Sequence, residues 1–77
     1  MEPEIIMGAF GARLKGLRKE KGVKQSDLAE LLGITIRQYQ RTEYGEVNVP
    51  SLSHIQLADY FGVTTDYLLG RSEERGK

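Results

Sequence analysis

Side chains that can form paired hydrogen bonds gather between Gln25 and Gly45, in the segment QSDLAELLGITIRQYQRTEYG. Its second half has few apolar residues and carries two arginines and two glutamines, namely Arg37, Gln38, Gln40 and Arg41. Arginine matches the O6 and N7 acceptors of guanine, and glutamine matches N6 and N7 of adenine. This pattern predicts a helix face that contacts a partner, and base edges of nucleic acid fit its chemistry.

Residues that would indicate catalysis or metal binding are scarce. The chain has no cysteine and a single histidine, His54, which predicts a surface or helix-packing histidine instead of a structural metal ligand. Gly11 and Gly16 have the spacing of a phosphate-binding loop, but Leu17 and Arg18 follow where lysine and a hydroxyl residue are needed. No pair of nucleophile and base stands out. We therefore expect no enzyme, no metal, no cofactor and no small-molecule ligand.

The length and composition indicate one small domain. A chain of 77 residues can bury a single core, and the absence of cysteine is typical of a reducing cytoplasm. The first ten residues, MEPEIIMGAF, carry Glu2 and Glu4 where a signal peptide has basic residues. No apolar run approaches the roughly 18 residues of a membrane span. We expect a cytoplasmic protein that has no membrane partner.

Charge is distributed unevenly, although the net charge is zero. Residues 13–41 hold eight basic and three acidic residues, a balance of plus five, and the remainder of the chain carries minus five. A basic half that contains the Gln25–Gly45 segment favours a polyanionic partner, whereas a solvated helix face explains the charge pattern equally well. Charge alone leaves both interpretations open.

Five glycines predict five helices, because each follows a stretch with helical spacing and can adopt the positive φ that ends a helix. They are Gly22, Gly33, Gly45, Gly62 and Gly70. The spacing of apolar residues predicts the first helix from about Met7 to Lys21, with Phe10, Leu14 and Leu17 inward, and the second from Gln25 to Leu32. The third should begin at Ile36, because Thr35 and Gln38 have the spacing of a capping box.

The C-terminal third predicts two more helices and a tail. The fourth helix lies between Pro50 and Phe61, with inward residues at three-residue steps, namely Leu52, Ile55, Ala58 and Phe61. The fifth is the segment TDYLL, capped by Thr64 and ended by Gly70. Alternation typical of a strand is confined to EVNV. The predicted fold is an all-α five-helix bundle over residues 7–70, followed by a loose polar tail or linker at 71–77.

Several linked motifs resemble the lambda-repressor-like, or xre-type, helix-turn-helix family. They are RLKGLRKEKGVKQ before the second helix, Leu28-Ala29 within it, LGIT at the turn, Glu43 and Gly45 at the end of the third helix, and GVTTDYLLG. The resemblance spans about residues 10–70. It implies a bundle whose third helix enters the major groove of DNA while the second helix lies across the backbone.

The resemblance also implies roles for individual residues. Base contacts are expected from Ile36, Arg37, Gln38, Gln40 and Arg41, where Ile36 can only pack on a thymine methyl group or on its own domain. Contacts to the DNA backbone are expected from Lys24, Gln25, Ser26 and Thr35. Arg18 and Glu43 are expected to form an internal ion pair between the first and third helices.

Three residues depart from the family pattern. Tyr39 stands at a core position that is usually aliphatic, so its hydroxyl should lie at the edge of the core. Thr42 is smaller and more polar than usual, so either the core is thinner there or a neighbour fills the space. Lys24 stands at the cap of the second helix but cannot accept from backbone N–H groups.

Together these features predict a sequence-specific regulator of transcription that binds double-stranded DNA, most simply a repressor. One recognition helix suggests a homodimer on a pseudo-palindromic operator whose half-sites lie about one DNA turn apart. The expected dimer surface comprises the last two helices and the tail, with Tyr60, Tyr67 and Leu69 exposed. Zero net charge leaves open an alternative, a protein-binding antitoxin or adaptor with the same fold.

Overall fold

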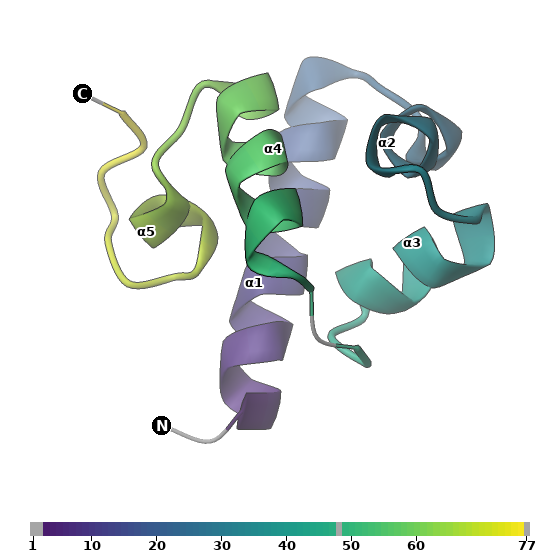
Figure 1. The fold of residues 1–77 in the computed structure, drawn as a ribbon. Helices are drawn as coiled ribbons and strands as arrows, with labels where there is room; N and C mark the ends of the chain where they lie inside the picture. The colour runs from purple at the N-terminus through teal and green to yellow at the C-terminus, as the bar shows by residue number, and fades with distance from the viewer. Residues whose placement is uncertain (1–2, 48, 77) are drawn as a thin grey trace.

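Every regular element of the described structure is a helix. The computed structural model describes residues 3–47 and 49–76 and contains α1 (Pro3–Lys21), α2 (Gln25–Leu32), α3 (Ile36–Glu43), α4 (Ser51–Phe61) and α5 (Thr65–Leu68) (Figure 1). No strand occurs over these ranges, and Asn48 of the EVNV segment lies outside them. The all-α, five-helix prediction is therefore confirmed.

The ends of the helices follow the predicted signals. All five glycines have positive φ, and Gly33 ends α2 in the left-handed conformation with φ of 68°. At the start of α3, the Thr35 hydroxyl accepts from the Gln38 N–H at 3.1 Å and the Gln38 side chain accepts from the Thr35 N–H at 3.0 Å. At α2, the Asp27 carboxylate accepts from the Lys24 N–H at 2.9 Å. The Lys24 side chain makes no capping bond, as its chemistry predicts.

Two predictions about helix bounds and register are wrong. Helix α1 begins at Pro3 instead of Met7, because proline is well suited to the first turn of a helix and Gly8 is tolerated within it. In α4, Leu52 is 75% exposed and Ile55 is 49% exposed. The inward face of α4 instead follows the three- and four-residue spacing of a helix stripe, at His54, Leu57, Ala58 and Phe61.

The core draws side chains from all five helices. Its buried apolar residues are Phe10, Leu14, Leu17, Leu28, Ala29, Tyr39, Leu57, Ala58, Tyr67 and Leu68. Leu31 is exposed, so α2 buries only one side of its apolar pattern. Tyr67 is buried, so it cannot belong to the exposed dimer surface predicted from the sequence.

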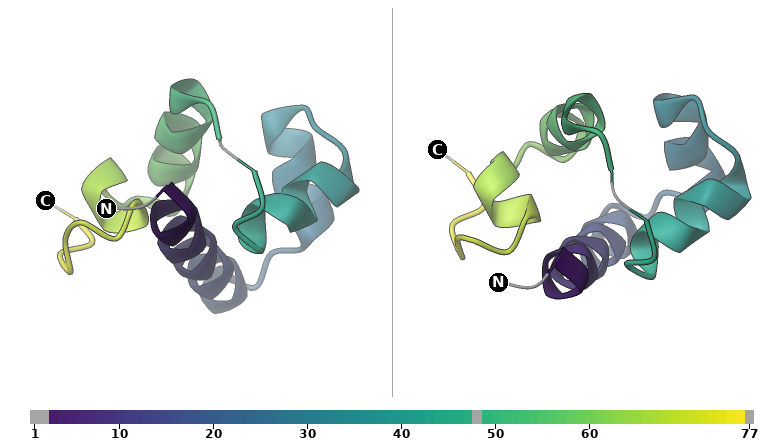
Figure 2. Two further views of the ribbon diagram at one scale, coloured as in Figure 1. Left: turned by 90° about the horizontal axis from the view of Figure 1, so that it is seen from below. Right: turned by 60° about the horizontal axis from the view of Figure 1, so that its bottom comes forward.

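Helices α1 and α4 run through the middle of the molecule and separate two regions. Figures 1 and 2 show α2 and α3 on one side, and α5 with the C-terminal end on the other. Helix α1 contacts both α3 and α5 and is therefore the element that both regions share.

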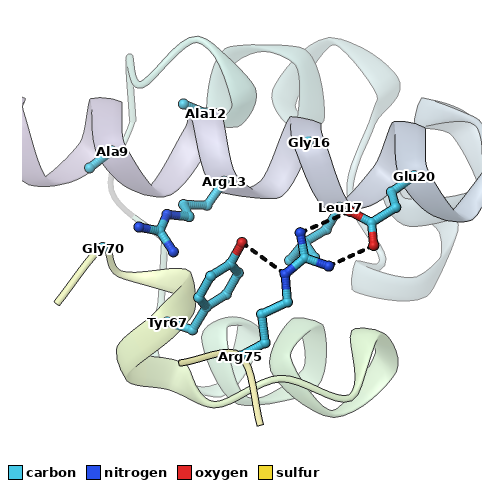
Figure 3. Close-up of a pocket in the computed structure, with 9 residues that line it drawn as sticks. All are labelled: Ala9, Ala12, Arg13, Gly16, Leu17, Glu20, Tyr67, Gly70 and Arg75. Atoms are coloured by element: carbon cyan, nitrogen blue, oxygen red, sulfur yellow. Dashed lines mark hydrogen bonds and ion pairs between the residues drawn. The ribbon is translucent and has the colours of Figure 1, made fainter. Parts of the chain in front are cut away.

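Residues 71–76 fold back along α1, so the prediction of a loose tail is wrong for them. The Arg75 guanidinium pairs with both Glu20 oxygens at 2.6 and 2.9 Å (Figure 3). Arg13 pairs with Glu73 at 2.7 Å. The guanidinium carbon of Arg13 lies 4.2 Å from the centroid of the Tyr67 ring, and that of Arg75 lies 5.4 Å from it. We call Arg13, Glu20, Tyr67, Glu73 and Arg75 the C-terminal clasp. These ion pairs could not be predicted from the sequence, because their partners are far apart in the chain and other residues of opposite charge are equally available.

Candidate nucleic-acid interface

Helix α3 presents most of its predicted base-contacting residues to solvent. Ile36, Arg37, Gln38 and Arg41 are exposed, and Gln40 is half-buried. Arg37 makes no hydrogen bond or ion pair with the described residues, and Arg41 lies 3.5 Å from the Glu46 carboxylate, with both side chains half-exposed. The exposed face of α3 therefore offers cations and amides on a short helix.

The opposite face of α3 is buried, as its spacing predicts. Tyr39 is fully buried, and Thr42 and Glu43 are also buried. Gly11 of α1 lies directly against this end of the helix, where an added Cβ would collide with the Glu43 carbonyl oxygen and lie 2.9 Å from that of Thr42. The absence of a side chain at Gly11 therefore permits the close contact between α1 and α3.

A buried hydrogen-bond network fixes α3 to α1 and α2. Arg18 Nε donates to Glu43 Oε2 at 2.6 Å, and Arg18 Nη2 donates to Oε1 at 3.3 Å, so the expected ion pair is present. The Tyr39 hydroxyl donates to Glu43 Oε2 at 2.5 Å, and Gln25 Nε2 donates to Oε1 at 3.3 Å. We call Arg18, Gln25, Tyr39 and Glu43 the α3 anchor. No buried side-chain polar atom among the described residues lacks a partner.

The electrostatics of the α3 anchor favour an ionised Glu43. Burial alone would raise the pKa of Glu43, but hydrogen bonds from Arg18, Tyr39 and Gln25 outweigh it and hold the pKa below its usual value. Burial and the Glu43 carboxylate raise the pKa of Tyr39, which therefore keeps its proton and donates it to the hydrogen bond. The Glu43 carboxylate raises the pKa of Arg18 in turn. The carboxylate is thus a permanent acceptor for three donors.

The residues expected to contact the DNA backbone lie at two helix starts: Lys24, Gln25 and Ser26 at α2, and Thr35 at α3. Lys24, Ser26 and Thr35 are exposed, whereas Gln25 is half-buried. The Gln25 Oε1 accepts from Gln40 Nε2 at 3.1 Å while its Nε2 bonds Glu43. The structure therefore brings together a predicted backbone contact, Gln25, and a predicted base contact, Gln40.

The two unusual residues of α3 are accommodated differently. The Tyr39 hydroxyl lies inside the α3 anchor instead of at the edge of the core, so that part of the prediction is wrong; the i, i+4 spacing of Tyr39 and Glu43 was the available signal. The Thr42 hydroxyl donates to the Gln38 carbonyl at 3.0 Å. Thr42 also lines a pocket of about 380 Å³, so the core is thinner there.

No group of three or more potential metal ligands occurs within the residues that the structure describes. His54 packs its ring 4.6 Å from that of Phe10, and burial lowers its pKa. The helix-packing role expected for this histidine is therefore confirmed.

Over the same described ranges, no helix combines the length and the apolar character that crossing a membrane requires.

Comparison with known sequences gives a match to the family model of a helix-turn-helix domain over residues 9–69. The SPbeta prophage-derived uncharacterized HTH-type transcriptional regulator YonR of Bacillus subtilis (strain 168) is 40% identical over 60 residues, which are 78% of this chain and 56% of YonR. The HTH-type transcriptional regulator ImmR of the same organism is 35% identical over 68 residues, covering 84% of this chain and 51% of ImmR. The chain spans about half the length of these curated relatives.

Comparison with solved structures gives a match to the restriction-modification controller protein C.AhdI from Aeromonas hydrophila. The TM-score is 0.71 and the sequence identity 32%, and the match covers 80% of this chain and 94% of the C.AhdI chain. Because the domain match takes in α2, the turn and α3, and the fold agrees, this chain belongs to the lambda-repressor-like, xre-type helix-turn-helix family.

Proposed function

We propose that this protein is a sequence-specific regulator of transcription that binds double-stranded DNA and reads bases with α3. The observation that carries the proposal is the division of α3 into a buried face, tied to α1 and α2 through Glu43, and an exposed face bearing Arg37, Gln38 and Arg41. A reading helix must be rigid and must offer bidentate donors, and this helix combines both properties. The regulator names of the relatives support the same function.

Within this function, base and backbone contacts have different jobs. Arg37 and Arg41 are the side chains best suited to choose a sequence, with Gln38, Gln40 and Ile36 beside them. Gln25 and the first N–H groups of α2 are suited to hold a phosphate, with Lys24 and Ser26 beside them in sequence, and Thr35 would contact the backbone from the start of α3. The bond between Gln25 and Gln40 would then couple the position of the backbone contact to that of the reading helix.

A homodimer would give this small domain usable specificity by placing a second α3 one DNA turn away. Leu52 and Ile55 lie one turn apart on α4 and are exposed, which supports α4 as the dimer surface. Tyr60 and Leu69, which were also expected on this surface, are half-buried. We propose a cytoplasmic repressor without enzymatic activity, which excludes polymerase from a pseudo-palindromic operator.

Selection from a random pool of duplex DNA tests this function. We expect recovery of a two-part site whose halves lie about one DNA turn apart. Affinity for the recovered site should fall linearly with salt on logarithmic axes, because phosphate contacts release counterions. If no sequence is recovered and the affinity for duplex DNA does not change with salt concentration, DNA recognition is contradicted. The alternative of a protein-binding antitoxin or adaptor is then favoured.

A further inference from the structure

The pocket beside α3 has the size and lining of a site for a small molecule. We call it the α3 pocket. Its volume is about 380 Å³, and it lies between α2, α3 and residues 47, 49, 50 and 53. Its apolar wall comprises Leu32, Ile34, Val47, Val49 and Pro50. Ligand sites are typically concave, of a few hundred Å³, and apolar with a few polar groups.

The described residues leave the α3 pocket unfilled for two reasons. Thr42, one of three α3 residues that line the pocket, is short, and its hydroxyl is already bonded to the Gln38 carbonyl, so it projects little into this space. The apolar residues at the start of α4, Leu52 and Ile55, point to solvent, and Ser53 lines the pocket in their place. A ligand would therefore bury apolar wall that no described side chain covers.

The polar groups of the pocket select a negatively charged head group. Arg41 is the one charged residue among those that line it, and its partner Glu46 stands 3.5 Å away with both side chains half-exposed. Gln38 also lines the pocket; its side-chain oxygen accepts from the Thr35 N–H, which directs its amide N–H groups to other acceptors. Carboxylates are the acceptors that a guanidinium binds with two parallel hydrogen bonds.

We propose that the α3 pocket binds a small amphipathic carboxylate, with its apolar part against the valine and isoleucine wall and its carboxylate on Arg41. Arg41 and Gln38 are also proposed base contacts. A bound carboxylate would therefore compete with DNA for these side chains, and this second part of the inference rests on the proposed function.

Titration with hexanoate, followed by amide NMR shifts of the DNA-free protein, tests the binding site. We expect saturable shifts confined to residues around 32–34, 41–42 and 49–53. Hexanamide, which has the same shape without the charge, should bind about tenfold more weakly, as expected for the loss of a charge-assisted contact. Absence of saturation at millimolar hexanoate, or shifts centred elsewhere, would overturn the site.

Substitutions assign the two halves of the ligand. Arg41→Gln changes a half-exposed side chain and should weaken hexanoate about tenfold while leaving hexanamide unaffected. Arg71→Gln removes the same charge from the exposed C-terminal segment and should change neither affinity. Ser53→Phe fills the pocket and should abolish both. Equal hexanoate affinity in Arg41→Gln and the unmodified protein would overturn the assigned head-group contact.

Competition is measured separately, on the DNA recovered by selection. Hexanoate should raise the apparent Kd of the unmodified protein for that DNA, whereas hexanamide should have little effect. If hexanoate binds without changing the affinity for DNA, the proposed competition with DNA is wrong, but the proposed binding site in the α3 pocket is retained. If no DNA is recovered at all, the proposed function fails and the DNA-free titration still decides the pocket.

Discussion

Three arginine–carboxylate contacts of the described residues tie distant segments to α1, and two of them, Arg18–Glu43 and Arg75–Glu20, have the same shortest distance of 2.6 Å. In the α3 anchor, the side chains of Arg18 and Glu43 are 14% and 2% exposed. In the C-terminal clasp, those of Arg75 and Glu20 are 49% and 57% exposed. Removing one partner of a buried pair leaves the other charge buried, with neither a partner nor water. Removing one partner of an exposed pair leaves the other charge in solvent. Burial, and not distance, therefore decides which contact the fold depends on.

The two contacts also differ in what they position. The α3 anchor lies under the proposed reading face and joins three helices through one carboxylate. The clasp lies on the other side of α1 and holds only α5 and residues 71–76 (Figures 1 and 3). Damage to the anchor should therefore reach the DNA-binding surface, and damage to the clasp should not.

The largest effect is expected from Arg18→Ala. The substitution leaves the buried Glu43 carboxylate without its cationic partner and should destabilise the fold by about 3–5 kcal/mol. Chemical denaturation measures this loss as a free energy of unfolding. An unchanged unfolding curve would remove the distinction between the anchor and the clasp.

A second prediction compares two glycines of α1. Gly11→Ala places a Cβ against the Glu43 and Thr42 carbonyl oxygens and should cost about 1–3 kcal/mol, because the backbone of α3 must move. Gly16→Ala is the matched control, since nothing lies within 4 Å of its Cβ, and it should stabilise the helix by about 0.5–1 kcal/mol. Melting temperatures that shift in the same direction would contradict the close contact at Gly11.

The burial of His54 is intermediate between that of the α3 anchor and that of the C-terminal clasp. Burial lowers its pKa from 6.5, so below that pH the unfolded chain binds more protons than the folded one. Stability should therefore fall modestly from about pH 7.5 to about pH 5.5, while Glu43 stays ionised because its pKa is lowered. His54→Gln should flatten this slope in denaturation experiments. A slope that the substitution leaves intact would place the responsible proton elsewhere.

The smallest effect is expected from Arg75→Ala. Both partners of its ion pair are exposed, so the melting temperature should stay within experimental error. The end of the C-terminal segment, residues 74–76, should nevertheless lose its contact to α1, visible as faster amide exchange or sharper NMR signals there, while Arg13 still pairs with Glu73. A large drop in melting temperature would show that the clasp supports the core.

The sequence predicted those features that depend on local chemistry. The bounds of α2, the capping box of α3 and all five glycine ends follow from residues within a few positions of each other. The Arg18–Glu43 pair was also expected, but from the family resemblance and not from its spacing.

Features that depend on distant packing were missed. The prediction of the α4 register failed because Leu52 and Ile55 suit an apolar face as well as Leu57 and Ala58 do, and only packing against the rest of the bundle decides between them. The clasp was missed because Glu20 and Arg75 are 55 residues apart and exposed charges pair with many partners. Predicting the pocket beside Thr42 would have required the register of α4, in which Leu52 and Ile55 point outward, as well as the short side chain of Thr42.

The most direct test of the central claim, that α3 reads bases while α2 grips the backbone, compares two substitutions on selected and scrambled DNA. Arg41→Ala should weaken the selected site by about 1–3 kcal/mol and relax preference at one base pair, with little change on scrambled DNA. Lys24→Ala, which removes an exposed proposed backbone contact outside the α3 anchor, should weaken both DNAs alike. Equal losses on both DNAs for Arg41→Ala would contradict the claim and make Arg41 a phosphate contact.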